Sequence, residues 1–231
     1  MVSAVRFQTA SGAAAQGVVA EPIVPSLAAG VLILHGSQGL TDHVRSIVRR
    51  FAHAGFVSFA PDLYRGRVAD TPEEAERLAH ELDWDDALDR IDGAVRTLGT
   101  HPRCNGNAGI VGFGIGGALA FSAASRIAGL SAAVPFYGMP RKGQAELERI
   151  RVPVLAHVAT RDPRVSVQLA HDIQRRVRAA GGEMDVCVYE TGHAFLNETR
   201  SDAYDAVAAT LAWDRTVTFL REKLGESATA D

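Results

Sequence analysis

Two residues have the type and the position to form a catalytic pair. Asp162 follows an apolar run at 154–158, and His193 follows a second apolar run at 186–189. An aspartate that hydrogen-bonds to a histidine orients the imidazole and stabilises the charge that it gains with a proton. A single loop aspartate is most often a turn or cap residue, but the placement of both residues after strand-like runs favours a general base.

A glycine turn precedes this pair in the chain. The stretch GIVGFGIGGALA, residues 109–120, joins an apolar run to a run of small residues. A strand, a glycine-flanked turn and a helix present the nucleophile in α/β-hydrolases, whose triad follows the chain order nucleophile, acid, histidine. Here Gly114 stands at the nucleophile's place and has no side chain. A phosphate-cradling loop is the competing interpretation, but the stretch lacks a Walker lysine and a complete G-x-G-x-x-G pattern.

Other residues near the turn have their own predicted roles. We expect the backbone N–H groups of Ile115 and of Gly36 or Ser37 to form an oxyanion hole. Backbone donors do not depend on a side chain at position 114. Ser37 is also an alternative nucleophile, since it follows another predicted strand. Cys104 should lie about 17 Å from the turn, at the opposite end of the strand, and Cys187 should be buried inside a strand.

Alternating strands and helices are expected to position these residues. Continuous apolar runs are typical of parallel strands that are covered on both faces. Such strands are predicted at 31–34, 56–59, 109–111, 132–135, 154–158 and 186–189. Helices are predicted at 42–54, 73–98 with an interruption, 116–129, 165–180 and 203–224. This order indicates an open α/β sheet, with an antiparallel edge hairpin formed by the opening 25 residues.

Length and composition indicate an ordinary globular protein. With 231 residues, 47% hydrophobic and 22% charged, the chain is expected to form one domain, 1–231, with its core at about 15–224. The formal net charge of -3 disfavours a nucleic-acid partner. Neither a signal peptide nor a run of roughly 18 apolar residues is present, so we expect a cytoplasmic protein without a membrane partner. Two cysteines predict reduced thiols and no metal site.

Four stretches together resemble the dienelactone hydrolase (carboxymethylenebutenolidase) family over roughly residues 15–224. They are 61–64 (PDLY), 109–121 with its glycine turn, 192–195 (GHAF) and 212–216 (AWDRT). The resemblance implies a single-domain α/β-hydrolase fold that opens enol-lactones through a cysteine nucleophile, an aspartate and a histidine. Asp162 would then orient His193, which would act as the general base.

The same resemblance marks two departures from the family pattern. The place of the cysteine falls on Gly114, and the place of a glutamate that contacts the resting cysteine falls near Gly36. Both departures remove parts of one thiol-activating arrangement. Without a thiol, a water molecule beside His193 is the expected nucleophile.

Further side chains are candidates for substrate binding. We expect Gly36, Tyr64, Arg65 and Phe195 to contact the substrate, with Arg65 and Arg67 either binding a carboxylate or forming a solvated basic loop. The aromatic residues Tyr64, Phe136, Tyr137 and Phe195 are expected either to line an apolar pocket or to lie in the core. The remaining histidines are expected to be solvated: His43, His53, His80, His101 and His171.

The leading hypothesis from the sequence is an enzyme that acts on a small lactone, ester or related carbonyl compound. Three alternatives stay open: a lyase or isomerase with His193 as its base, a non-catalytic ligand-binding relative of the hydrolases, and an engineered or accidental loss of the nucleophile. The expected partner is a small molecule. No cofactor is expected, and the chain is expected to be a monomer or a homodimer.

Overall fold

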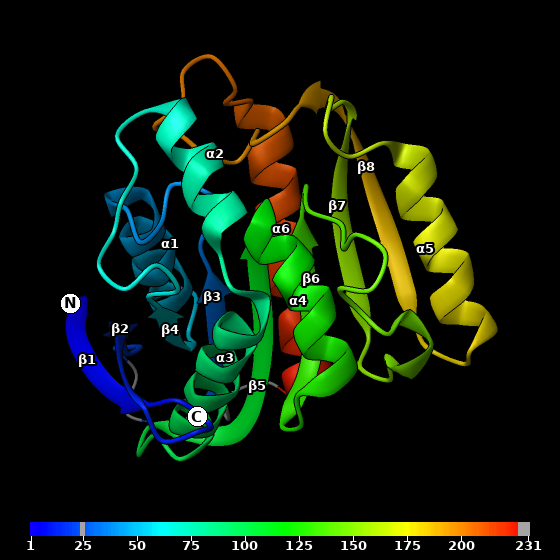
Figure 1. Ribbon diagram of the computed structural model, residues 1–231. Coiled ribbons are helices and arrows are strands. Elements are labelled where there is room, and N and C mark those ends of the chain that lie inside the picture. The colour runs from blue at the N-terminus through cyan, green and yellow to red at the C-terminus, as the bar shows by residue number, and fades with distance from the viewer. Residues whose placement is uncertain (24–25, 226–231) are drawn as a thin grey trace.

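A computed structural model describes residues 1–23 and 26–225 of the chain. One eight-stranded sheet runs through it in the order β1-β2-β4-β3-β5-β6-β7-β8 (Figure 1). The strands are β1 (Ser3–Gln8), β2 (Ala14–Ala20), β3 (Ala28–Leu34), β4 (Val57–Pro61), β5 (Cys104–Phe113), β6 (Leu130–Phe136), β7 (Val154–Arg161) and β8 (Met184–Gly192). The helices are α1 (Asp42–His53), α2 (Pro72–Glu81), α3 (Trp84–Gly99), α4 (Ile115–Arg126), α5 (Val167–Ala179) and α6 (Ala206–Leu224), with a 3-10 turn at Leu147–Arg149.

The sheet is antiparallel at one edge and parallel elsewhere. β1 and β2 form the predicted edge hairpin, whose last two expected residues, 24–25, lie outside the described residues. From β4 to β8 the paired strands are parallel, so their carboxyl ends lie along one edge. The predicted α/β fold is therefore confirmed, and the one sheet fits a single domain.

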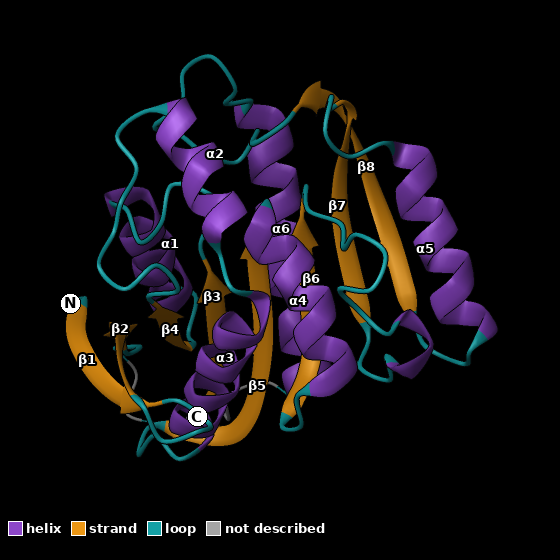
Figure 2. Ribbon diagram, viewed as in Figure 1, coloured by secondary structure: helices purple, strands orange, loops and turns teal. Residues whose placement is uncertain are grey.

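Helices cover both faces of the sheet, which explains why the strands read as continuous apolar runs. α1 and α6 lie on one face of the sheet, while α3, α4 and α5 lie on the other. α2 lies on the same side as α3 and above it in the view of Figure 2. All seven residues of β3 are buried. β5 begins earlier than predicted, at Cys104. Its first half includes the exposed residues 105–107 (Asn-Gly-Asn), which interrupt the apolar pattern of the sequence.

Side-chain caps set where two of the helices begin. The interruption predicted within 73–98 lies at Asp83, whose carboxylate accepts hydrogen bonds from the backbone N–H groups of Asp85 and Asp86. Asp205 caps α6 in the same way, by accepting from the N–H groups of Val207 and Ala208. α6 therefore begins at residue 206 rather than at the predicted 203.

A buried histidine joins β7 to α6 and β8. The His157 Nδ1 atom lies 2.8 Å from the Tyr189 hydroxyl, and Nε2 lies 3.1 Å from the Thr216 hydroxyl. The Thr216 hydroxyl donates to the Ala212 carbonyl, so Nε2–H donates to Thr216. Burial lowers the pKa of His157 to about 3, with a smaller contribution from the charge of Arg215. His157 is therefore a neutral hydrogen-bonding group of the core.

The glycine turn between β5 and α4 is packed backbone against backbone. A Cβ atom on Gly112 would lie 2.0 Å from the Gly116 carbonyl oxygen, and one on Gly116 would lie 2.5 Å from that of Leu34. A Cβ atom on Gly138 would lie 1.8 Å from the Gly114 carbonyl oxygen. Gly114 differs, since a Cβ atom there would meet nothing within 4 Å. Close approach thus requires glycine at the three neighbouring positions and leaves open space at Gly114.

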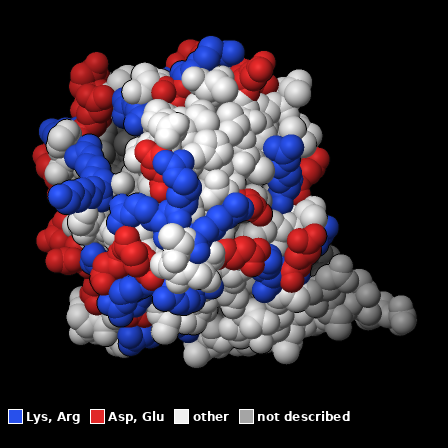
Figure 3. Space-filling model, turned by 90° about the vertical axis from the view of Figure 1, so that its right-hand side faces the viewer, with Lys and Arg blue, Asp and Glu red and all other residues white. Residues whose placement is uncertain are grey.

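The outer surface carries both signs of charge. On the face with α5 and β8, acidic and basic side chains are interspersed (Figure 3). Two ion pairs lie there, Arg176 with Glu148 and Arg178 with Asp185, each with atoms 2.6 Å apart. Across residues 1–23 and 26–225, the structure has no helix of the length and apolarity that crossing a membrane requires.

The packing of the turn leads to a stability prediction. Gly116→Ala should lower the free energy of unfolding by about 1–3 kcal/mol, because the added methyl overlaps two backbone carbonyl groups that cannot rotate away. Gly99→Ala is the matched control, since a Cβ atom at the end of α3 meets nothing within 4 Å. The control should be neutral or more stable by up to about 1 kcal/mol. Urea denaturation measures both, and equal effects would contradict this account of the turn.

Candidate active site

Asp162 and His193 are in direct contact at the carboxyl ends of two neighbouring strands. β7 ends at Arg161 and β8 ends at Gly192, and these two residues are partners in the parallel ladder. The residues that directly follow the two strands, Asp162 and His193, therefore lie at the same edge of the sheet. The His193 Nδ1 atom lies 2.7 Å from the Asp162 Oδ2 atom.

The Asp162 carboxylate is held in one orientation. Its side chain has 0% exposure, and Oδ1 accepts hydrogen bonds from the backbone N–H groups of Arg164 and Val165, at 2.8 and 3.1 Å. Burial works against ionisation, but the hydrogen bond from His193 and these N–H groups outweigh it and lower the pKa of Asp162. An ionised Asp162 fixes the proton of neutral His193 on Nδ1 and leaves Nε2 as the proton acceptor.

His193 opens onto a pocket of about 490 Å³. The pocket lies over the carboxyl ends of the parallel strands, where each of five strands supplies a residue from the loop that follows it. These residues are Gly36, Gly114, Tyr137, Pro163 and His193. The His193 side chain is 24% exposed, so its ring can reach a ligand in the pocket.

Gly114 is the N-cap residue of α4, whose start lies at this pocket. Its φ of 55° and ψ of -116° are unusual for a residue with a side chain. The Gly114 carbonyl oxygen accepts from the N–H groups of Gly117 and Ala118. The N–H of Ile115 lies in the first turn of α4, where helical N–H groups have no intrahelical acceptor and carry partial positive charge.

A second loop lies beside this turn. Gly36 comes so near that a Cβ atom on it would be 3.5 Å from the Phe113 carbonyl oxygen. His35 fixes this loop, because its Nδ1 lies 2.8 Å from the Gly36 carbonyl oxygen and its Nε2 accepts from the Leu63 N–H. Burial lowers the pKa of His35, so the ring is neutral and matches this pair of bonds. The loop with Gly36 and Ser37 is thus held next to the start of α4.

Tyr137 forms the wall of the pocket beside the histidine. Its ring contacts the His193 ring edge to face, with centroids 5.1 Å apart. Burial raises the pKa of Tyr137, and the charges of Glu198 and Asp162 raise it further. The phenol therefore stays protonated and can donate a hydrogen bond at neutral pH. Its φ of 36° is an unusual backbone conformation for a residue with a side chain.

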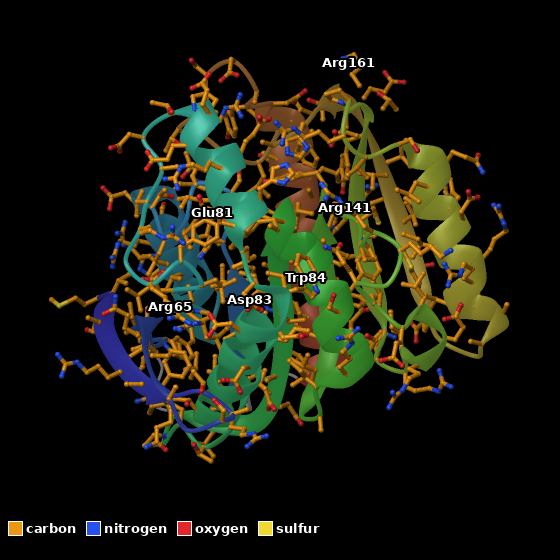
Figure 4. All side chains as sticks on the ribbon, in the orientation of Figure 1. Arg65, Glu81, Asp83, Trp84, Arg141 and Arg161 are labelled. Carbon is orange, nitrogen blue, oxygen red and sulfur yellow. The ribbon has the colours of Figure 1, made fainter. Side chains whose placement is uncertain are left out.

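Of the residues predicted to bind substrate, Gly36 lines the pocket and the other three do not. Tyr64 is 1% exposed, with its ring against His35, and Phe195 is 0% exposed, with its ring against Tyr137. Both aromatic side chains belong to the core. Arg65 lies on the flank of the molecule, below the edge at which Arg161 lies (Figure 4), and pairs with Asp86.

The other predicted residues are placed as follows. Ser37 and Gly114 line the pocket, whereas Asp162 lies behind His193 and Ile115 is half-buried at the start of α4. Phe136 lies in the core, stacked on His157. Arg67 pairs with Glu81 on the surface.

The two cysteines are remote from His193. Cys104 starts β5, at the end opposite the turn, and is buried. Cys187 lies in β8 and is half-buried, not fully buried as predicted, because β8 is an edge strand. Among residues 1–23 and 26–225, no group of three histidine, cysteine or acidic side chains is arranged to hold a metal ion.

The sequence interpretation missed several residues of the pocket. The loop after His193 contributes Asn197, Arg200 and Asp202. The polar run 197–202 follows the same strand as His193, which is the signal that could have identified it. Arg164, in the loop after β7, and Glu76, in α2, also line the pocket and pair with each other at 3.0 Å.

His43 departs from its predicted environment. The sequence predicts a solvated ring, but His43 is 8% exposed and lines the pocket. The loop after His193 covers it, and its Nδ1 lies 3.2 Å from Glu198 Oε2. Local sequence around His43 gives no indication of that loop. The other four histidines are exposed or half-buried.

Known proteins resemble this chain over nearly its whole length. Protein usf from Aquifex pyrophilus is 36% identical over 84% of this chain and 88% of its own length. A carboxymethylenebutenolidase from Pseudomonas putida is 30% identical over 79% of this chain and 80% of its own. The solved structure of a dienelactone hydrolase-like promiscuous phosphotriesterase from metagenomic libraries has a TM-score of 0.85 at 23% identity, covering 97% of this chain and 99% of its own.

The model of the dienelactone hydrolase family matches residues 15–224, the range over which the resemblance was predicted. The sheet order, the helices on both faces and the solved structure agree with it. The chain therefore belongs to the dienelactone hydrolase family.

Proposed function

We propose that this protein hydrolyses a small lactone or ester by activating water, without forming a covalent acyl intermediate. The observation that carries the proposal is the His193–Asp162 pair, which opens onto a pocket where the Cβ position of Gly114 is open space. Family membership supports lactone or ester hydrolysis, and the relative from Pseudomonas putida bears the name carboxymethylenebutenolidase.

The first step is attack by water. Because Gly114 has no side chain, the space beside it can hold a water molecule. His193 Nε2 takes one proton from this water while its oxygen bonds to the substrate carbonyl carbon. The carbonyl oxygen becomes an oxyanion, which accepts hydrogen bonds from the backbone N–H groups of Ile115 and Ser37.

The second step is collapse of the tetrahedral intermediate. The bond between the acyl carbon and the ring or ester oxygen breaks, and the His193 imidazolium returns its proton to that leaving oxygen. The acid product ionises into solvent, so water supplies every atom that is added. Asp162 stabilises the imidazolium between the two steps, because its buried carboxylate faces Nδ1 throughout.

Removal of the base tests the proposal directly. His193→Gln should lower kcat for γ-butyrolactone and for an activated aryl ester by about 10²- to 10⁴-fold, the usual contribution of a general base. His53→Gln, an exposed change at the end of α1, is the control and should keep the wild-type rate. Reaction in ¹⁸O-labelled water should place one labelled oxygen in the acid. Deuterium entering the product from heavy water without hydrolysis would instead indicate a lyase or isomerase.

A second prediction concerns the open space at position 114. Gly114→Cys should produce a thioester-bound protein, detected by mass spectrometry as the added mass of one acyl group, and a burst of alcohol release. The steady rate on the aryl ester should rise by at least about tenfold, and adding His193→Ala should remove the gain. The left-handed backbone should make this variant about 1–2 kcal/mol less stable. A Cys variant that folds but is never acylated would contradict the proposed geometry.

A third prediction follows from the buried carboxylate. Asp162→Asn should lower kcat by about 10²- to 10⁴-fold, because the amide no longer holds His193 in the required tautomer. The folded-state pKa of Asp162 lies below its ordinary 3.8, so its contribution to stability is complete above that pH and is lost as the pH falls through the folded value. The stability difference between wild type and variant in urea should therefore be largest at pH 7 and shrink below about pH 4. A difference that does not depend on pH would contradict the pairing.

A further inference from the structure

The wall of the pocket at the start of α1 carries a second histidine beside a carboxylate. The His43 side chain is 9% exposed, and its Nδ1 atom lies 3.2 Å from Oε2 of Glu198. Nδ1 is buried and has no well-aligned hydrogen-bond partner within the part of the chain that the structure describes. His43 lines the pocket, and of its two ring nitrogens only Nδ1 is buried without a hydrogen-bond partner among the described residues, so we assign Nε2 to the ligand. The water-activation mechanism uses neither residue.

A threonine lies two residues before this histidine, at the start of the same helix. Thr41 lines the same pocket and occupies the N-cap position of α1, but its side chain makes no cap hydrogen bond. The hydroxyl of an N-cap threonine usually accepts a hydrogen bond from a backbone N–H group in the first turn of the helix. Here the hydroxyl is left for a ligand, and it can both donate and accept.

The charge state of His43 defines what this wall can bind. Burial lowers the pKa of His43, an effect that Glu198 opposes but does not reverse. The ring is therefore neutral at pH 7. The carboxylate of Glu198 next to Nδ1 favours the proton on that nitrogen, which leaves a lone pair on Nε2. The wall thus presents an acceptor at His43 and a group of either kind at Thr41.

We propose that Thr41 and His43 form a subsite for a substrate hydroxyl group, so that the preferred substrates are hydroxylated lactones or esters. The inference rests on the proposed hydrolysis and names its substrate class. A hydroxyl group donates to His43 Nε2 and accepts from the Thr41 hydroxyl, and thereby satisfies both. At this subsite a carboxylate is disfavoured, since it brings no donor for Nε2 and is repelled by Glu198.

The substrate preference tests the subsite. The probes are γ-butyrolactone and its α-hydroxy and β-hydroxy derivatives, with each kcat/KM divided by the rate of alkaline hydrolysis of the same lactone. Wild type should prefer at least one hydroxylated lactone by about tenfold to a hundredfold, because a buried acceptor is left unpaired without the hydroxyl. Equal normalised values for all three lactones would overturn the proposal.

Two variants assign the preference to these side chains. His43→Phe keeps a planar ring without the acceptor, and Thr41→Val keeps the shape without the hydroxyl. Each should reduce the preference to less than about threefold. His53→Phe, the same change at an exposed position of the same helix, should keep it. If His43→Phe lowers the rates on all lactones in the same proportion, His43 has only a structural role and the proposal fails.

A binding measurement separates this inference from the proposed hydrolysis. If wild type cleaves none of the lactones, hydrolysis is wrong, and the subsite is read from histidine ¹⁵N NMR spectra. Saturating hydroxylated lactone should then shift the Nε2 resonance of His43, which is assigned by its loss in His43→Phe, and γ-butyrolactone should not. Absence of that selective shift would overturn the subsite by itself.

Discussion

The arrangement of the site depends on how closely the start of α4 approaches the ends of β3 and β6. Backbone meets backbone there, with Gly116 against the Leu34 carbonyl and Gly138 against the Gly114 carbonyl. No side chain separates these segments. The loop at Gly36 and the first N–H groups of α4 are therefore held near each other, and the pocket takes its floor from both. The location of His193 follows from the parallel register of β7 and β8.

Three histidines of this fold have different roles because their surroundings differ. His35 and His157 are fully buried, and burial lowers the pKa of each, so they act as neutral groups that hold a loop and a helix in place. His193 instead combines partial exposure with an inaccessible carboxylate at Nδ1. A ring that can gain a proton needs both a charge partner and access to the reactant. Of these three histidines, His193 alone has both.

The sequence predicts the order of the elements and the pair Asp162–His193 well, because apolar runs and strand ends are local patterns. It fails where placement depends on contacts between distant segments. Tyr64 and Phe195 follow strand ends as substrate-binding residues do, but their rings turn into the core. His43 is covered by a loop more than a hundred residues away in sequence, at Glu198. Hydrophobic periodicity in the sequence does not indicate which loop covers a given helix end. Contacts such as that between His43 and Glu198 are therefore seen only in the three-dimensional structure.

The open space at Gly114 also bears on how the chain tolerates mutation. A residue with a side chain would hold a φ of 55° at a cost of roughly 1–2 kcal/mol, whereas glycine adopts it without that strain. In a marginally stable domain this difference is a sizeable share of the folding free energy. The turn between β5 and α4 thus has its backbone conformation without the strain that a side chain at position 114 would add. A destabilising substitution in the wall of the pocket therefore draws on a folding free energy that this turn has not reduced.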